Sequence, residues 1–468
     1  MKKFLLFSLC CLLSSLSQAQ LQLNWTTPID VAPASFGNDY PRIVLNGEQQ
    51  PMITWGSNKK VYFTRFFDAG FLDPLQLNDD TTNAYVASWT GPDLVARNDT
   101  IYAGFMHEQW HKKTYIVRSF DNGQSFSAPL LVENYPDSAS RFPTVAIDQL
   151  GNPVVAVMKM GLNEQDPHYV LRKSFDYGTS FTAESTVGGW SGVQSQACDC
   201  CPAAVTAEGA NLAVVYRDNL NNVRDIWAAV STDNGQSIEQ GFTVDDNHWQ
   251  ISACPSSGPD AVLIGDTLCS VFLSGNACYL SRTSISTGIL ASVVQLGALP
   301  VAGNQNFPRI DRLNKQVVIT WRGSAGINKY LHLAYTDDIT NGAPFLQDTV
   351  YTGNFSAADV ALGAEGVHVA MEDITGTVKY MHGTFSSTAV DVVPAASISI
   401  FPNPCADLMH IDAHGTFGQF AIYRLDGSLV QRGVLESPLD VSPLPTGSYI
   451  LELLDADKRQ VRQLFVKN

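Results

Sequence analysis

The chain has 468 residues, which is enough for one large domain and one small one. Its hydrophobic fraction of 45%, with 35 glycines and 23 prolines, is typical of a turn-rich β protein. The formal net charge of −16 repels the phosphates of nucleic acids and anionic lipid surfaces, so we expect no nucleic-acid partner.

The N-terminus has the features of a signal peptide over residues 1–19. Lys2 and Lys3 give a positive start, an apolar run follows at 4–13, and small residues precede position 20. The sequence therefore predicts an exported protein. Two of the nine cysteines leave with the signal, and disulfides are the default for most of the seven that remain.

An eight-residue motif occurs three times in the next part of the chain, and we call its copies the aspartate turns. They read SFDNGQSF from Ser119, SFDYGTSF from Ser174 and STDNGQSI from Ser231, so their aspartates lie 55 and 57 residues apart. A near-constant period of this length, filled with short β-type runs and turn residues, is typical of a β-propeller. Weaker copies bring the count to seven units; they lie at 65–70, 284–288, 335–338 and 381–385.

Each unit is predicted to form four short strands, A to D, with half-buried alternation of apolar and polar residues. Six units place a proline at the start of strand A, where its missing N–H does little harm. The seventh unit, from residue 360 to 385, lacks an outer strand, while an extra strand is expected at 25–31. We therefore expect an all-β, seven-bladed propeller over residues 20–390 that is closed by the N-terminal strand.

The aspartate turns have a structural explanation. Each aspartate can accept backbone N–H bonds in the turn between strands C and D, and each glycine can take a positive φ. We therefore expect these residues to hold turns rather than to catalyse a reaction. They are Asp121, Gly123, Asp176, Gly178, Asp233 and Gly235.

The aspartate turns resemble the Asp box, or bacterial neuraminidase repeat, of the sialidase superfamily, and the resemblance covers roughly residues 20–386. Members of that family are usually described as six-bladed, so six blades is the alternative to our count of seven. The resemblance implies a sialidase-like protein that recognises a glycan or another extracellular ligand. The alternatives are an exo-sialidase or related glycoside hydrolase, and a non-catalytic surface adhesion or scaffold propeller.

The composition changes near residue 393, and residues 394–468 have the turn signals of a small β-sandwich. These signals are Asn-Pro, Asp-Gly and Thr-Gly pairs between short β-type runs. The segment resembles the type A C-terminal sorting domain of type IX secretion, known from Bacteroidetes. The resemblance implies a secreted or outer-membrane cell-surface protein with the type IX secretion machinery as a partner.

The predicted meander places the B–C turns and D–A connections on the face opposite the aspartate turns, and we expect the ligand site there. The position after the strand A proline, near the mouth of the central channel, is charged in four units: Arg42, Asp93, Asp260 and Arg309. Two guanidiniums from this set can grip a carboxylate bidentately. Alternatively, these charges only solvate a polar channel mouth.

The sialidase resemblance extends to part of that family's binding set. The stretch Tyr40-Pro-Arg42-Ile43 resembles its Arg-Ile-Pro motif, with the proline displaced, which implies an arginine triad. The other members would be Arg309 or Arg322, with Arg217 or Arg224, and the neighbouring Asp218 and Asp225 complete the candidate ligand-binding set.

The family's catalytic residues fit less well. The turn at 56–60, where the family places an acid/base aspartate, contains no carboxylate. The family also has a tyrosine nucleophile with a glutamate partner. Tyr330 or Tyr351 could be paired with Glu372 in these roles, but no motif supports that choice. Retaining glycoside cleavage needs both an acid/base and a nucleophile, so the catalytic residues stay unknown.

Four cysteines lie in two consecutive D–A connections that we expect to meet: Cys198, Cys200, Cys201 and Cys254. Disulfides that stiffen these connections are the ordinary interpretation in an exported protein. The alternative is a thiolate metal site for copper or zinc, and no other cofactor is expected. Cys269 and Cys278 flank the B–C turn of the fifth unit and are expected to form a separate cross-strand disulfide.

Overall fold

The computed structural model describes residues 21–32, 38–109, 113–133, 135–192, 195–297, 303–342, 345–387, 398–413, 417–455 and 460–468. The chain divides into two compact units, one of Leu21–Ser386 and one that contains Ser387–Asn468. The signal peptide predicted at 1–19 lies outside the described residues. Among the described residues, no helix has the length and apolar character that crossing a membrane requires.

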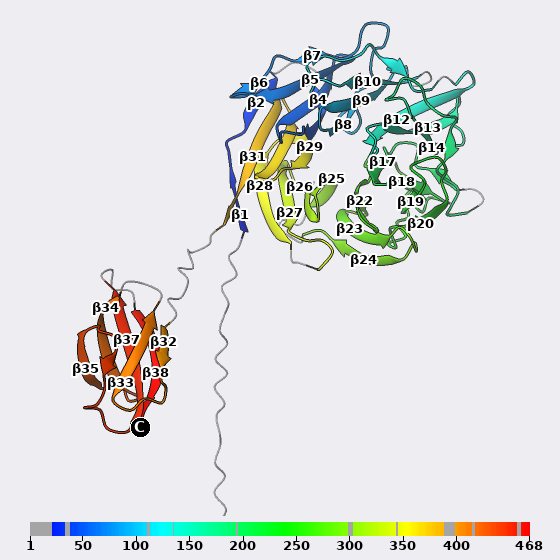
Figure 1. Ribbon diagram of the computed structural model, residues 1–468. Helices are drawn as coiled ribbons and strands as arrows, with labels where there is room; N and C mark the ends of the chain where they lie inside the picture. The colour runs from blue at the N-terminus through cyan, green and yellow to red at the C-terminus, as the bar shows by residue number, and fades with distance from the viewer. Residues whose placement is uncertain are drawn as a thin grey trace, which may run out of the picture. The chain divides into compact units, whose positions relative to one another are not determined.

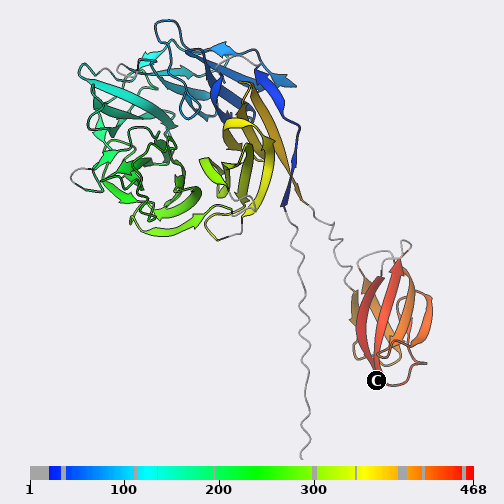
Figure 2. The ribbon, with the colours of Figure 1, turned by 180° about the vertical axis from the view of Figure 1, so that it is seen from behind.

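In the first unit, the described strands form seven sheets arranged as blades around a centre (Figures 1 and 2). Blade 1 contains β3 (Asp39–Leu45), β4 (Pro51–Ser57), β5 (Lys60–Phe67), β6 (Gly70–Phe71) and β7 (Leu75–Gln76). Blade 2 contains β8 (Asp93–Arg97), β9 (Thr100–Met106), β10 (Thr114–Ser119) and β11 (Leu130–Leu131). Blade 3 contains β12 (Ser138–Ile147), β13 (Pro153–Gly161), β14 (His168–Lys173) and β15 (Ser185–Thr186).

The remaining blades follow the same antiparallel meander. Blade 4 contains β16 (Gln196–Ala197), β17 (Ala204–Glu208), β18 (Asn211–Asn219), β19 (Ile226–Ser231) and β20 (Gln240–Thr243). Blade 5 contains β21 (Asp260–Ile264), β22 (Thr267–Ser274), β23 (Ala277–Ser284) and β24 (Leu290–Gln295). Blade 6 contains β25 (Asn304–Leu313), β26 (Gln316–Ala325), β27 (Asn328–Thr336) and β28 (Leu346–Gly353), and blade 7 contains β29 (Phe355–Leu362), β30 (Gly366–Asp373) and β31 (Val378–Ser387).

The two ends of the propeller sequence meet in blade 7. The N-terminal strands β1 (Leu21–Trp25) and β2 (Ile29–Ala32) both pair with β31, and Ile29 lies opposite Tyr380. Figure 1 shows β1 and β2 beside β31. The N-terminal strands therefore supply the outer strand that the seventh unit lacks, and the ring closes without an exposed edge at this position.

The hydrophobic core lies between neighbouring blades. One cluster, for example, joins Met158 and Tyr169 of blade 3 to Val214 and Tyr216 of blade 4, and all four are buried. Strand B of each blade is buried on both faces. In β4 (Pro51–Ser57), for example, every residue is buried. The half-buried alternation expected from the sequence is wrong for these strands, because each blade is packed between two others.

The aspartate turns share one face of the ring with the A–B turns. Asn122 N–H donates to the carbonyl of Asp99, and Asn234 N–H donates to the carbonyl of Ala210. Within the second turn, Asp176 accepts the hydroxyl of Ser180 at 2.6 Å and its backbone N–H at 2.8 Å. These two bonds lower the pKa of Asp176 to about 2. Gly178 takes a φ of 80°. The aspartate and glycine thus make the contacts and take the φ that a structural role requires. The B–C turns and D–A connections occupy the opposite face.

Strand A begins with a β-bulge in blades 1, 3 and 6. The residue before the proline has a positive φ in each case, 54° at Tyr40, 51° at Phe142 and 51° at Phe307. The pairing register with strand B shifts at the same three positions. The bulge takes the proline out of the ladder, so its missing N–H leaves no hydrogen bond broken.

The second unit is a sandwich of two sheets. One contains β32 (Ile398–Phe401), β33 (Leu408–Ala413) and β36 (Leu439–Asp440), and the other contains β34 (Phe417–Arg424), β35 (Leu429–Val434), β37 (Gly447–Asp455) and β38 (Gln460–Lys467). Its core includes Met409, Ile422, Leu451 and Phe465, and Cys405 is buried there as a free thiol.

Candidate functional site

The central channel has a narrow neck on the face opposite the aspartate turns. The neck brings together Arg42, Asp93, Asp260 and Arg309, and leaves a space of about 20 Å³. Arg42 Nε lies 3.0 Å from Asp93 Oδ1, and Arg42 Nη1 lies 3.0 Å from Asp359 Oδ1. Both predicted arginines therefore meet in one place, but carboxylates of the protein itself already pair with Arg42.

The neck carboxylates also hold neighbouring blades together. Asp93 Oδ2 accepts the N–H of Val145 at 2.8 Å, and Asp359 Oδ2 accepts the N–H of Ile43 at 2.9 Å. Asp260 makes the same kind of bond from blade 5 to blade 6. Each joins the A strands of two adjacent blades across their interface, so these aspartates have a structural role at the neck.

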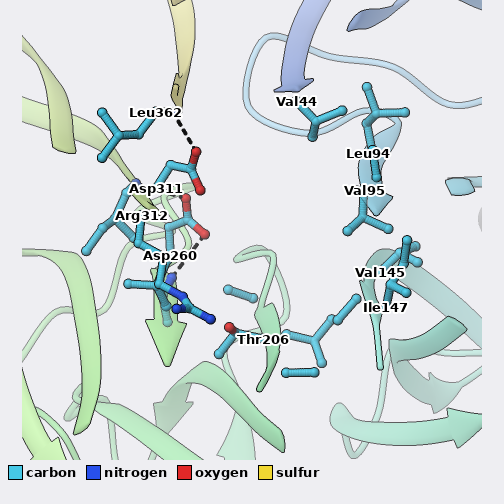
Figure 3. A pocket seen from close by; sticks show the side chains of 18 of the residues that line it. Val44, Leu94, Val95, Val145, Ile147, Thr206, Asp260, Asp311, Arg312 and Leu362 are labelled. Atoms are coloured by element: carbon cyan, nitrogen blue, oxygen red, sulfur yellow. Dashed lines mark hydrogen bonds between the residues drawn. The ribbon is translucent and has the colours of Figure 1, made fainter. Parts of the chain in front are cut away.

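Beyond the neck, the channel widens into a cavity of about 590 Å³ that reaches the A–B turns, and thus the face of the aspartate turns. Figure 3 shows apolar side chains such as Val44 and Leu94 on one side of this cavity, across from Asp260, Asp311 and Arg312. Burial raises the pKa of Asp311 to about 7, and its Oδ2 accepts the N–H of Leu362 at 2.7 Å.

The other predicted arginines lie in separate surroundings. Arg217 is fully buried, and its guanidinium donates to the carbonyls of Arg224 and Leu273 and stacks over Trp249, 5.2 Å from the ring centroid. Arg322 donates to the carbonyl of Ser356 at 2.7 Å. Because these guanidiniums bond to backbone carbonyls, they fasten blades and connections in the observed structure.

Two predicted aspartates lie near Arg217. Asp218 accepts the hydroxyl of Ser191 at 2.5 Å, and burial raises the pKa of Asp218 to about 6. Asp225 accepts the backbone N–H of Trp249 at 3.0 Å and lies 2.9 Å from His248 Nδ1.

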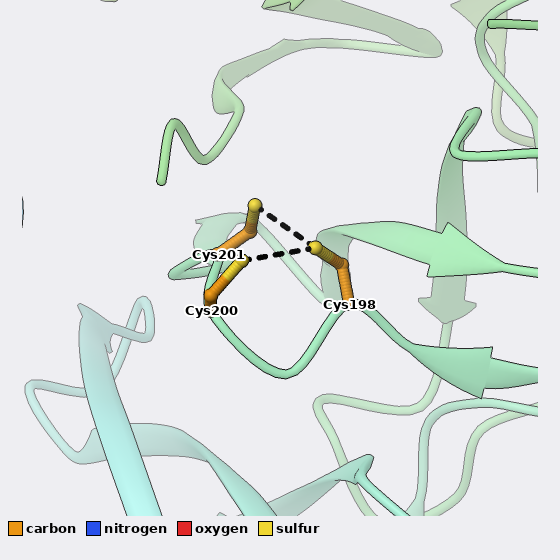
Figure 4. Close-up of side chains that lie close together, drawn as sticks. All are labelled: Cys198, Cys200 and Cys201. Atoms are coloured by element: carbon orange, nitrogen blue, oxygen red, sulfur yellow. Dashed lines mark hydrogen bonds between the residues drawn. The ribbon is translucent and has the colours of Figure 1, made fainter. Parts of the chain in front are cut away.

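The cysteine cluster links the two D–A connections on either side of blade 4. Cys200 and Cys254 form a disulfide, so one link of the expected kind is present. Cys198 and Cys201 are free thiols, and the expectation that most of the cysteines pair is wrong. Figure 4 shows the Cys198 sulfur beside those of Cys200 and Cys201, at Sγ to Sγ distances of 3.5 and 3.2 Å. Arg224 Nη1 donates to Cys198 Sγ at 2.8 Å. A hydrogen bond with the Cys201 thiol and the nearby arginines together lower the pKa of Cys198 to about 6. The three sulfurs lie within 4.8 Å of one another. Because Cys200 is bonded to Cys254, only Cys198 and Cys201 offer free thiols to a soft metal ion.

The disulfide expected between Cys269 and Cys278 does not form. Both residues are buried free thiols. The β22–β23 register explains the difference, because Cys278 lies opposite Leu273, while Cys269 lies opposite Arg282. Four residues along a strand separate the two positions by about 13 Å, which no disulfide spans.

Sequence reasoning missed a second pocket on the face opposite the aspartate turns, which we call the aromatic pocket. It encloses about 220 Å³ and is lined by Tyr85, Trp89, Met106, Arg141, Phe142, Glu164, Asp199 and Cys200. The Trp89 and Phe142 rings meet edge to face, with centroids 5.3 Å apart. Arg141 Nη2 donates to Glu164 Oε1 at 2.6 Å.

Three elements supply the ring pair and the ion pair of this pocket. The bulge at the start of β12 presents Arg141 and Phe142, while Trp89 comes from the connection before β8, and Glu164 comes from the turn after β13. The only mark of this pocket in the sequence is Arg141 with Phe142, directly before Pro143. These two residues occupy the position in blade 3 that Asp39 and Tyr40 occupy in blade 1.

A scan against protein families matches residues 399–467 to the secretion system C-terminal sorting domain. The C-terminal unit is a secretion sorting domain. The protein is therefore one that is secreted or carried to the cell surface, and the type IX secretion machinery is a partner of its sorting domain. No curated protein sequence matches the chain significantly.

Several solved structures resemble the chain at low identity. A protein of unknown function from Dyadobacter fermentans has 11% identity and a TM-score of 0.47, with 78% of this chain and 100% of that chain covered. An α-L-arabinanase from Penicillium chrysogenum, complexed with arabinobiose, has 14% identity and a TM-score of 0.46, with 64% and 94% covered. The NanB sialidase from Streptococcus pneumoniae has 9% identity and a TM-score of 0.45, with 78% and 92% covered.

Proposed function

We propose that this protein is an exported sialidase-like propeller that binds a glycan on the face opposite its aspartate turns. The observation that carries the proposal is the aromatic pocket, with its ring pair beside an arginine–glutamate pair. Ligand sites are concave and mostly apolar, with a few polar groups that fix orientation. Aromatic rings with charged groups beside them suit a sugar, which has both apolar and hydroxyl faces.

We propose that the glycan is acidic and that its carboxylate binds Arg141. The Arg141 side chain is 6% exposed, whereas that of its partner Glu164 is 44% exposed. A carboxylate on the ligand can take the place of Glu164 on the guanidinium, because the exposed glutamate can swing into water. The planar guanidinium can then bind that carboxylate through two hydrogen bonds.

The neck arginines are the alternative anchor for a carboxylate. Arg42 is held by Asp93 and Asp359, and Arg309 Nη2 donates to the hydroxyl of Tyr40. A ligand there would have to displace buried carboxylates that also join blades. In the aromatic pocket, the carboxylate that pairs with Arg141 belongs to an exposed side chain, and we therefore favour this pocket.

A glycan array probed with the secreted full-length protein tests the proposal. We expect binding to acidic glycans that is lost in Trp89→Ala and kept in Tyr177→Ala, an exposed aromatic on the opposite face. Binding that is equal in both variants would place the site elsewhere. The absence of glycan binding by the wild-type protein would favour an adhesion or scaffold role.

A second candidate function, glycoside hydrolysis, is supported by one carboxyl pair on the same face. Burial and the neighbouring Asp39 carboxyl raise the pKa of Glu372 to about 8. A carboxyl that keeps its proton at neutral pH is suited to act as a general acid.

A fluorogenic sialoside tests this candidate. If Glu372 acts in hydrolysis, the wild-type protein turns the substrate over and Glu372→Gln loses most of that activity. Turnover that depends on Arg42 and Arg309, measured in Arg42→Ala and Arg309→Ala, would return the sialidase interpretation to the neck. No turnover by the wild type removes hydrolysis of this substrate class.

A further inference from the structure

The disulfide Cys200–Cys254 has a third sulfur beside it. Cys198 Sγ lies 3.5 Å from Cys200 Sγ, and Cys198 itself is buried. Cys254, at the other end of the disulfide, is exposed to solvent. The cluster therefore places an interior thiol against one sulfur of the bond, with the other sulfur at the surface.

Positive charge surrounds the interior thiol. Arg224 Nη1 donates to Cys198 Sγ at 2.8 Å, and Arg224 Nε donates to the carbonyl of Ile251 at 3.2 Å. Ile251 belongs to the same connection as Cys254, so Arg224 bridges the two connections that the disulfide joins. A guanidinium in contact with sulfur favours the thiolate, which is the attacking species in disulfide exchange.

We propose that Cys198, Cys200 and Cys254 form a thiol–disulfide exchange site. The Cys198 thiolate attacks Cys200 Sγ, so that a Cys198–Cys200 bond forms while the Cys200–Cys254 bond breaks. The electron pair of the broken bond leaves on Cys254, which then takes a proton from water. One thiolate and one disulfide are present before and after the step, so no oxidant or reductant is consumed.

The exchange moves the reactive group from the interior to the surface. The Cys254 sulfur lies 3.2 Å from the hydroxyl of Ser256, which can donate to the departing thiolate. Once free, Cys254 is an exposed nucleophile that can attack a small disulfide and form a mixed disulfide, with release of one thiol. Small disulfides are therefore the class of co-reactant that this site would take.

The exchange also releases the staple between two connections. Cys200 and Asp199 line the aromatic pocket, and the Asp199 carbonyl lies 3.4 Å from Arg141 Nη1. A change in the disulfide partner of Cys200 would therefore move the side of the aromatic pocket that Asp199 and Cys200 form. This link to ligand binding rests on the proposed function, whereas the exchange itself does not.

Differential alkylation of the full-length secreted protein tests the exchange. The native protein, purified without reductant or chelator, is treated with iodoacetamide, then unfolded in acid and analysed by peptide mass spectrometry. We expect iodoacetamide label on Cys254, together with an internal disulfide in the peptide that contains Cys198 and Cys200. We expect the Cys254 label to be lost in Cys198→Ser and kept in Cys201→Ser.

The wild-type protein alone can overturn the proposal, so the result does not depend on how the variants fold. An unlabelled Cys254 in the wild type would do so, including the case in which elemental analysis finds near-stoichiometric copper or zinc on the thiols. Equal labelling in the wild type and Cys198→Ser would also do so. Since no glycan enters this assay, its failure leaves the glycan-binding proposal untouched, and a failed glycan array leaves the exchange untouched.

Discussion

The carboxyls of the aspartate turns and the buried carboxyls on the opposite face of the propeller have pKa values shifted in opposite directions. In the aspartate turns, hydrogen bonds from Ser180 lower the pKa of Asp176 to about 2. On the opposite face, burial raises the pKa of both Asp218 and Asp245 to about 6, and that of Glu372 to about 8. Similar side chains are kept ionised in the aspartate turns and pushed toward the protonated state where they are buried on the opposite face.

This difference distinguishes carboxylates that hold a turn from carboxyls that are candidates for a functional role. A carboxylate that accepts several N–H and O–H bonds is locked in one geometry, and its repetition every 55 to 57 residues reproduces the same turn. A carboxyl that is buried with few donors is costly to ionise, and such groups gather at functional sites. The face opposite the aspartate turns, with its long connections, is where the chain departs from its own repeat.

The largest expected effect comes from the neck, where a buried ion pair also joins two blades. Asp359→Ala leaves Arg42 with one carboxylate partner and leaves the buried N–H of Ile43 without its acceptor. Removal of one partner of a buried pair costs about 3–5 kcal/mol, so we expect a loss of this order in the free energy of unfolding. Denaturant titration of the full-length protein measures it.

The matched control is an exposed pair in the same blade. Asp30 lies 2.6 Å from Lys379, and its side chain is 62% exposed, so Asp30→Ala should cost about 0–1 kcal/mol. A loss at Asp359 as small as the loss at Asp30 would mean that the neck carboxylates do not hold the ring, and would return them to the ligand-binding set.

The next effect is a pH dependence of opposite sign on the two faces. The folded-state pKa of Asp218 is raised to about 6, so the folded state keeps a proton that the unfolded state loses from about pH 4 upward. Its contribution to stability therefore falls as the pH rises from about 4 to about 6. Asp218→Asn removes this pH dependence. As the pH rises from about 4 to about 6, we therefore expect the free energy of unfolding of the variant to increase by roughly 1–3 kcal/mol relative to that of the wild type.

Asp176 gives the opposite case. Its pKa is lowered to about 2, so its contribution is present above about pH 4 and is lost as the pH falls toward 2. Asp176→Asn should therefore weaken the protein at neutral pH and have less effect in acid. Denaturant midpoints measured across this pH range would contradict the comparison if both variants shifted in the same direction.

The ring itself was predictable from the sequence because its repeat is local. Each aspartate turn makes its bonds within about four residues, as between Asp121 and Ser125, so the motif alone specifies the turn. The count of seven units followed from the weaker copies of the motif, and the closure by the N-terminal strand followed from the missing outer strand of the last unit. The burial of strand B on both faces did not follow, because it depends on neighbouring blades.

The candidate site was less predictable because its contacts cross the chain. Asp359, which pairs with Arg42 from 317 residues away, lies in the unit that has no strand A proline to mark its position. A disulfide between the two adjacent connections was predictable, but the choice of Cys200 and Cys254 as its partners was not. The register that separates Cys269 from Cys278 also has no sequence signal. The aromatic pocket needs five separate segments of the chain to meet, and no local pattern predicts that.

A smaller effect is expected in the aromatic pocket, where Arg141 is the proposed anchor for an acidic glycan. Arg141→Lys keeps the charge but loses the planar fork that binds a carboxylate through two hydrogen bonds. We expect roughly tenfold weaker binding of acidic glycans, the loss of about one charge-assisted hydrogen bond, and little change for neutral ones. Titration calorimetry with an array-identified glycan measures both. An equal loss for neutral glycans would assign Arg141 a packing role instead.

The smallest effect, and the sharpest for the proposed displacement, is expected at Glu164. Glu164 Oε1 accepts a hydrogen bond from Arg141 Nη2 at 2.6 Å, and the Glu164 side chain is 44% exposed. Glu164→Gln keeps the size of the side chain and removes the charge that competes with the ligand. Because the half-exposed ion pair is worth about 0.2–1 kcal/mol, acidic glycans should bind roughly 1.4- to fivefold more tightly to the variant. Weaker binding in Glu164→Gln would mean that the glutamate contacts the ligand itself, and a neutral or basic group would then be the better match for the pocket.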